Sequence, residues 1–93
     1  MKLDELSQNF SINLRVLRTQ QNLSQLVLAQ RAELSVAYVS LLERGKRSPP
    51  LPTVVQVAKA LRVKPVYLLQ ELDLPKGVRD LRKRPRAARS GAR

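Results

Sequence analysis

The stretch LSQLVLAQRAELSVAYVSLLERGK, residues 23–46, decides the fold of this 93-residue chain. Ser24 and Ser35 each precede a short amphipathic run, where a serine hydroxyl can accept a hydrogen bond from a free N–H of a first helical turn. Gly45 follows the second run and can take the left-handed backbone that ends a helix. The stretch therefore predicts two short helices joined by a turn of about four residues.

The apolar residues on either side of this stretch also recur at helical spacing. Before it they predict a leader turn and a helix from Leu3 to about Gln20, and after it Pro52 suits the first turn of a fourth helix and Pro65 opens a short fifth. The apolar positions that follow this period are Leu3, Leu6, Phe10, Leu14, Leu17, Leu28, Ala29, Ala32, Val39, Leu42, Leu51, Val54, Val57, Ala58, Leu61, Val66, Leu68, Leu69 and Leu72. The sequence therefore predicts one all-α domain of five helices over residues 1–74.

The net charge of +11 is unevenly distributed along the chain. Residues 1–74 carry ten Lys/Arg and six Asp/Glu, whereas residues 75–93 carry eight and one. The second segment is rich in Arg, Pro, Gly, Ala and Ser and poor in large apolar residues, so we expect a disordered, flexible basic tail at 75–93. The charge favours a polyanionic partner; the alternative is a solvated basic face or tail without a specific partner.

The chain contains no Cys and no His. This composition excludes disulfides and thiolate metal sites, and it removes the usual metal ligand and neutral-pH base. The sequence also lacks paired catalytic carboxylates and a phosphate-binding glycine loop, so we expect no enzyme, no metal and no cofactor. Nothing in it resembles a signal peptide or a membrane span, and we expect a cytoplasmic protein with no membrane contact.

Several short motifs occur in a fixed order. They are Leu-Ser-Gln (23–25), Leu-Ala (28–29), Leu-Ser (34–35), Tyr-Val-Ser (38–40), Glu-Arg-Gly-Lys-Arg (43–47) and Ala-Lys-Ala-Leu (58–61) followed by Val63. This series resembles the Cro and phage-repressor family, also called the xenobiotic-response-element family, over about residues 10–69. The resemblance implies a compact five-helix, repressor-like DNA-binding domain with its helix-turn-helix at residues 24–45. It also implies a homodimer on a pseudo-palindromic operator, as in small transcriptional regulators and restriction-modification controller proteins.

The resemblance further implies roles for individual residues, with the third helix in the major groove and the second across the DNA backbone. Gln25 matches a phosphate contact, and residues 46–48 match loop contacts that position the protein without reading sequence. Arg18 and Glu43 match a structural salt bridge. The fifth helix is expected at a dimer interface through Val66, Leu69 and Leu72, with packing inside one protomer as the alternative. The full set expected to contact double-stranded DNA is Ser24, Gln25, Ser35, Val36, Ala37, Tyr38, Ser40, Leu41, Arg44, Lys46, Arg47 and Ser48.

The third helix departs from the family pattern at the positions expected to face DNA. Val36, Ala37 and Leu41 stand where many relatives carry Gln, Arg, Asn or Lys, so the bidentate side chains that read guanine or adenine are missing. Three interpretations stay open: contact with thymine methyl groups, DNA binding with weak discrimination, or an apolar protein interface shared with Leu26 and Val27. The last would fit an antitoxin-like module that binds a protein partner as well as DNA.

Other positions allow smaller predictions. Glu33 and Arg62 stand where relatives often have Gly. Each residue therefore either adopts the left-handed backbone that Gly allows or forces a different turn, and both options carry a cost in stability. Ile12 and Val16 lie off the core stripe of the first helix and either mark another contact surface or have no such role. The segment 79–93 has no aromatic residue to stack on bases, so its role is electrostatic or merely solubilising.

Overall fold

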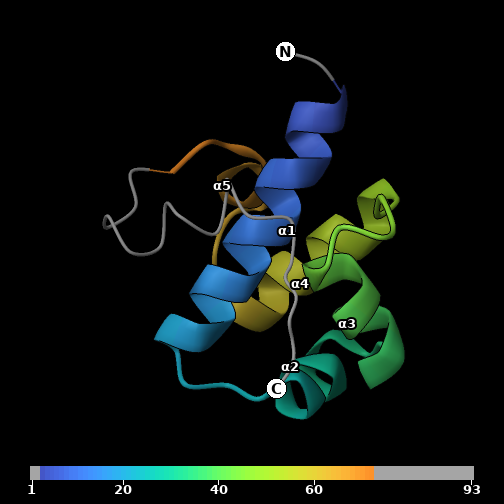
Figure 1. Ribbon diagram of the computed structural model, residues 1–93. Coiled ribbons are helices and arrows are strands. Elements are labelled where there is room, and N and C mark those ends of the chain that lie inside the picture. The colour runs from blue at the N-terminus through green and yellow to red at the C-terminus, as the bar shows by residue number, and fades with distance from the viewer. Residues whose placement is uncertain (1–2, 73–93) are drawn as a thin grey trace, which may run out of the picture.

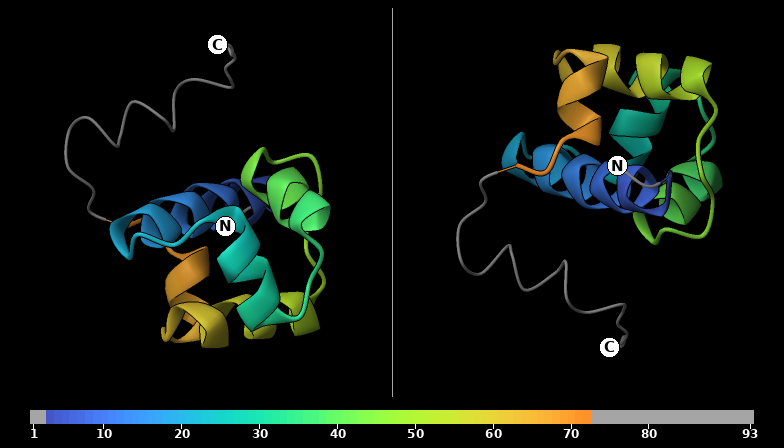
Figure 2. Two further views of the ribbon diagram at one scale, coloured as in Figure 1. Left: turned by 90° about the horizontal axis from the view of Figure 1, so that it is seen from below. Right: turned by 90° about the horizontal axis from the view of Figure 1, so that it is seen from above.

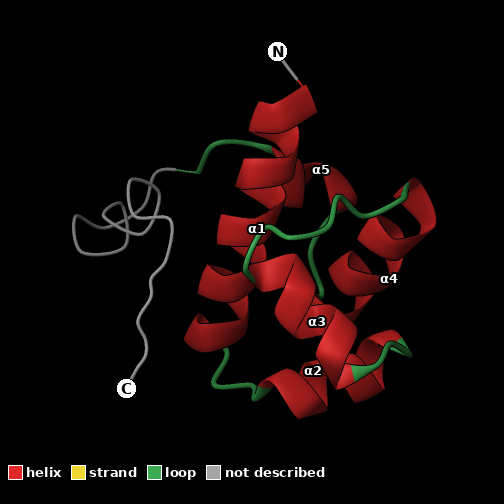
Figure 3. Ribbon diagram, turned by 45° about the vertical axis from the view of Figure 1, so that its right-hand side comes forward, coloured by secondary structure: helices red, strands yellow, loops and turns green. Residues whose placement is uncertain are grey.

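The structure is a computed structural model, and it describes residues 3–72 (Figure 1). Over this range the chain forms five helices and no strand (Figure 3). They are α1 (Leu3–Gln20), α2 (Gln25–Ala32), α3 (Val36–Glu43), α4 (Leu51–Leu61) and α5 (Pro65–Leu69). The predicted all-α class and the five predicted helices are confirmed. The predicted tail lies outside the described residues, and the boundary at residue 74 stays a prediction.

α1 packs against α3, α4 and α5, while α2 packs against α3 and α4. α3 and α5 lie well apart, at opposite sides of the domain (Figures 1 and 2). None of the five helices is long and apolar enough to cross a membrane. The core comes from every helix and consists of Phe10, Leu14, Leu17, Leu28, Ala29, Ala32, Val39, Leu42, Val54, Val57, Ala58, Ala60, Leu61 and Leu68.

Serine caps begin both helices of the motif. Ser24 Oγ accepts a hydrogen bond from the backbone N–H of Val27 at 3.0 Å, and Ser35 Oγ accepts one from the N–H of Tyr38 at 3.1 Å. Each bond satisfies one of the N–H groups that a first helical turn leaves free. The two predicted caps are therefore confirmed.

Four of the helices, α1 to α4, end in the same hydrogen-bond pattern. A residue with positive φ donates its N–H three residues back, and the next residue donates its N–H five residues back, which is the Schellman motif. The positive-φ residues are Asn22 (59°), Glu33 (60°), Gly45 (71°) and Arg62 (60°). Glu33 and Arg62 thus adopt the left-handed backbone rather than avoid it, at a conformational cost of roughly 1–2 kcal/mol each.

Three apolar positions differ from the predictions. Leu51 is 70% exposed, because it is the first residue of α4 and precedes the turns that meet the core. Leu72 is not on α5, since Gln70 is extended (ψ 157°) and the helix ends at Leu69. Val16 is only 4% exposed and therefore offers no contact surface.

Two asparagines of α1 bind the carboxyl end of α5. Asn9 Nδ2 donates to the carbonyl of Leu69 at 3.0 Å, and Asn13 Nδ2 donates to the carbonyls of Leu68 at 2.9 Å and Gln70 at 2.7 Å. These bonds satisfy carbonyl groups that the end of a helix leaves free. Val16, one turn after Asn13 on the same face of α1, is buried as well.

Candidate nucleic-acid interface

α3 has one buried and one exposed face. Val39, Leu42 and Glu43 are buried, as the helical period predicts for the first two. On the other side Ala37 and Arg44 are exposed, and Val36, at the start of the helix, is 43% exposed. The remaining residues of the helix, Tyr38, Ser40 and Leu41, are half-buried, and Tyr38 packs partly against the core. Tyr38 therefore lies less freely on the outward face than the sequence predicts.

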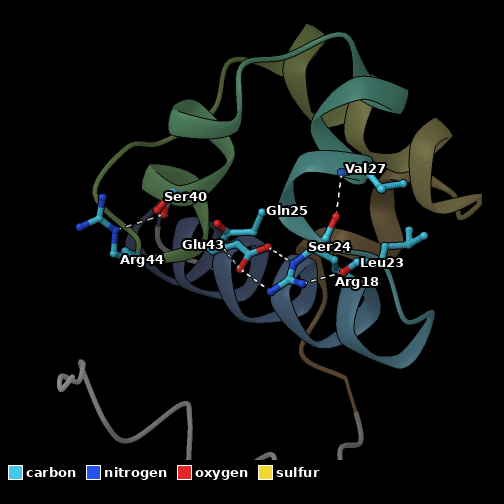
Figure 4. Close-up of polar contacts among 8 residues, drawn as sticks. All are labelled: Arg18, Leu23, Ser24, Gln25, Val27, Ser40, Glu43 and Arg44. Atoms are coloured by element: carbon cyan, nitrogen blue, oxygen red, sulfur yellow. Dashed lines mark hydrogen bonds and ion pairs between the residues drawn. The ribbon is translucent and has the colours of Figure 1, made fainter. Parts of the chain in front are cut away.

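The end of α3 is tied to α1 and α2 by a buried ion pair (Figure 4). Arg18 Nε donates to Glu43 Oε2 at 2.5 Å, and Arg18 Nη2 donates to Glu43 Oε1 at 3.1 Å. Arg18 Nη1 also donates to the carbonyl of Leu23 at 2.7 Å. The exposed fractions are 16% for the Arg18 side chain and 4% for that of Glu43. The guanidinium thus links α1, the loop before α2 and the last residue of α3, as its planar set of donors allows.

Gln25, the first residue of α2, joins the same network. Its Nε2 donates to Glu43 Oε1 at 3.0 Å, a contact that the sequence analysis missed. Because an amide NH₂ group carries two hydrogens, a phosphate can still take the second one. The carboxylate of Glu43 therefore orients Gln25 at the start of α2 as well as Arg18 on α1.

The loop after α3 differs from the other Schellman ends. At the ends of α1, α2 and α4, the residue after the positive-φ position is Leu23, Leu34 or Val63, and each packs against the core. At the end of α3 the equivalent residue is Lys46, whose N–H donates to the carbonyl of Leu41 at 2.9 Å and whose side chain is exposed. A cation thus stands where the other ends place an apolar contact.

The next residues of this loop are also exposed and polar. Arg47 is exposed, and Ser48 Oγ lies 2.8 Å from Ser7 Oγ of α1, a contact that the sequence did not predict. On the preceding turn, Arg44 Nε donates to the carbonyl of Ser40 at 3.4 Å, and its guanidinium extends away from the ion pair (Figure 4). Three cationic side chains, those of Arg44, Lys46 and Arg47, are thus exposed at the end of α3.

The arrangement defines a class of protein. α2 and α3 are two short capped helices joined by a tight turn. α3 is fixed through its inner face and has exposed cations at its end, and this is the arrangement of a DNA-binding helix-turn-helix domain. The chain belongs to the helix-turn-helix family, whose model matches residues 14–68. The predicted membership of the Cro and phage-repressor type is confirmed. The protein is accordingly a DNA-binding transcriptional regulator.

Individual relatives agree with this family. The HTH-type transcriptional regulator y4dJ of Sinorhizobium fredii is 38% identical over 61 residues, which cover 66% of this chain and 79% of the relative. The restriction-modification controller protein C.AhdI from Aeromonas hydrophila is 37% identical, with a TM-score of 0.64 over 72% of this chain and 98% of that one. The hypothetical transcription factor NHTF from Neisseria is 30% identical, with a TM-score of 0.68 over 87% and 88%.

Proposed function

We propose that the protein regulates transcription as a homodimer bound to a pseudo-palindromic operator, with α3 of each protomer in the major groove and α2 across the DNA backbone. The observation that carries this proposal is how α3 is held. The Arg18–Glu43 pair fixes its end against α1, while Ala37 and Val36 on its outer side stay exposed. A helix held in this way can enter a groove without rearranging.

The proposed DNA contacts fall into two groups. Val36, Ala37, Ser40 and Leu41, with Tyr38 at the edge, would meet base edges. The phosphate contacts would come from the starts of the two helices and from the loop after α3, namely Ser24, Gln25, Ser35, Arg44, Lys46, Arg47 and Ser48. The two capping serines accept their hydrogen bonds, so each hydroxyl keeps its proton to donate to a phosphate.

The proposed dimer contact lies on α5. Val66 is 58% exposed and Tyr67, which the sequence analysis did not single out, is 40% exposed. Leu69 and Leu72 are half-buried, and Leu69 packs against the core, so they would contribute only the edge of such an interface. Since α5 lies away from α3, both surfaces can be used at once, and a two-fold axis would place the half-sites roughly 34 Å apart.

Selection of bound duplexes from a random library tests the operator. We expect a short palindromic consensus, and no enriched sequence would contradict specific regulation. Repeating the selection with a variant that ends at Leu74 tests the basic tail. We propose that the tail adds only electrostatic contacts, so the consensus should stay the same while affinity falls and its salt dependence becomes shallower.

Sedimentation equilibrium tests the dimer. Val66→Glu places two charges at the proposed interface, so it should convert a concentration-dependent dimer into a monomer with unchanged helix content. Leu51→Glu is the matched control, because Leu51 is also exposed but begins α4, about 15 Å along that helix from its α5 end. A wild-type protein that stays monomeric, or a Val66→Glu variant that still dimerises, would refute this interface.

A protein partner is the second candidate function. The exposed apolar side chains of Leu26 (54%) and Val36 (43%), grouped in the sequence with Val27 and Leu41, favour an additional interface of the antitoxin kind, in the cytoplasm where we expect the protein. Such a partner should co-purify with the protein in a fixed stoichiometry. If no protein does so, these positions are isolated exposed residues, which are common on monomers.

A further inference from the structure

The outward side of α3 carries apolar groups where a DNA-reading helix usually carries amides or cations. Ala37 and Leu41 are one turn apart and share a face of the helix, which lies opposite the buried Val39 and Leu42. Val36, the first residue of the helix, adds a 43% exposed side chain beside this face. No Gln, Asn, Arg or Lys lies within α3 itself, so bidentate hydrogen bonding to a purine has no source there.

The major groove offers one apolar group that such a face can recognise. Among the four bases, only thymine presents a C5-methyl group at its edge, and contacts to that methyl are made by apolar side chains. 5-Methylcytosine carries the same group on the same ring carbon, although its hydrogen-bonding groups are those of cytosine. A face that reads pyrimidines through their methyl groups, with no Asn, Gln, Arg or Lys to hydrogen-bond a purine, should respond to both pyrimidines.

The charges around this face favour DNA over a protein as its occupant. Arg44, Lys46 and Arg47 are all exposed at the end of α3. The one acidic residue of the helix, Glu43, is buried and paired with Arg18. An apolar strip beside a cationic loop matches a groove floor with methyl groups between two phosphate backbones.

We infer that α3 selects its site by contact with pyrimidine C5-methyl groups and that Val36, Ala37 and Leu41 are the specificity-determining residues. A 5-methylcytosine can then replace thymine at a contacted position, which makes binding sensitive to cytosine methylation. The inference rests on the proposed function, because it needs α3 in the major groove.

The size of the effect follows from burying one methyl group against an apolar side chain. Removal of one such group from water changes an affinity by about fourfold. A homodimer meets each position twice, so removing a symmetric pair of methyls should weaken binding by about fifteenfold. Effects of this size are readily measured by titration of labelled duplexes.

The test uses the full chain and the duplex obtained by selection. Replacing thymine by deoxyuridine removes the methyl and leaves every hydrogen-bonding group unchanged. We expect a loss of about fourfold for each contacted thymine and no loss for thymines outside the half-sites. In a second arm, a contacted T·A pair is replaced by C·G and by 5-methylcytosine·G, and the methylated pair should bind about fourfold more tightly.

A protein variant assigns the effect to the helix. Val36→Thr keeps the shape of the side chain but replaces a methyl with a hydroxyl, so at one position it should reduce the preference for thymine over deoxyuridine. Leu51→Thr makes a related change away from α3 and should leave that preference unchanged, with both variants matching the wild type in helix content.

The possible results separate this inference from the proposed function. If the selected duplex binds but neither deoxyuridine nor 5-methylcytosine changes the affinity, methyl recognition is wrong and the operator proposal stands. A preference that survives in Val36→Thr, Ala37→Ser and Leu41→Thr alike also overturns the inference, because the methyl contact then lies elsewhere. If no duplex is selected at all, the proposed function fails first.

Discussion

Replacing Glu43 by alanine should destabilise the domain by about 3 kcal/mol. The substitution removes the acceptor of three hydrogen bonds, two from Arg18 and one from Gln25. It leaves a guanidinium that is 16% exposed, with only the carbonyl of Leu23 as its partner. Breaking a buried pair in this way typically costs about 3–5 kcal/mol, and the partial exposure of Arg18 places the value at the lower end.

Urea denaturation followed by circular dichroism at 222 nm measures this loss, and the melting temperature should fall by roughly 12–24 °C. The double variant Arg18→Met/Glu43→Ala separates the ion pair from simple packing. Once both charges are gone no unpaired charge remains, so the double variant should be about 2 kcal/mol more stable than the summed losses of Arg18→Met and Glu43→Ala predict.

Arg15→Met is the matched control for these variants. Arg15 is an exposed arginine of the same helix, and its replacement should change the free energy of unfolding by no more than about 0.5 kcal/mol. Two results would show that the pair does not hold α3. One is a loss below about 1 kcal/mol for Glu43→Ala, and the other is a double variant whose loss equals the sum of the losses of Arg18→Met and Glu43→Ala.

Three further substitutions test other parts of the structure. Lys46→Ala combined with Arg47→Ala should weaken all duplexes alike and reduce the slope of log affinity against log salt by about two; a changed consensus would contradict phosphate contacts. Glu33→Gly relieves a left-handed backbone, so the free energy of unfolding should rise by about 0.5–1 kcal/mol, and a fall would contradict that geometry. Asn13→Asp replaces the NH₂ group that faces the α5 carbonyls with a carboxylate oxygen. It should destabilise more than Asn13→Ala at neutral pH, with a gap that narrows in acid as the carboxyl becomes protonated and can donate; equal losses at all pH values would refute the contact.

Local signals made most of the fold predictable from the sequence. The serine caps at Ser24 and Ser35 and the helical spacing of apolar residues depend on neighbours within one or two turns, and the structure confirms them. The pairing of Arg18 with Glu43 joins residues far apart in the chain, so no local pattern indicates it. Only the resemblance to a family with a shared fold placed those two residues together.

The features that sequence reasoning missed depend on tertiary packing. Leu51 fits the helical period but begins its helix too early to reach the core. The asparagines of α1 give a weak signal, since Asn9 and Asn13 are polar residues one turn apart beside the core stripe. Their partners are backbone carbonyls of α5, and side-chain chemistry does not identify those from sequence. α5 also ends at Leu69, short of its predicted length, because Gln70 adopts an extended backbone.

The helix ends are anchored either by an apolar residue or by an ion pair, and this difference explains why the ion pair lies at the end of α3 in the described part of the motif. At the ends of α1, α2 and α4, an apolar residue follows the left-handed position and anchors the chain to the core. At the end of α3 that position is occupied by Lys46, whose side chain is exposed, so no apolar residue anchors this end to the core. Glu43, one residue before the turn, restores an anchor through Arg18 while leaving the loop free. The helix that we propose to meet DNA is therefore held on its inner side by an ion pair, and its stability should depend on that pair more than the ends of α1, α2 and α4 depend on any polar contact.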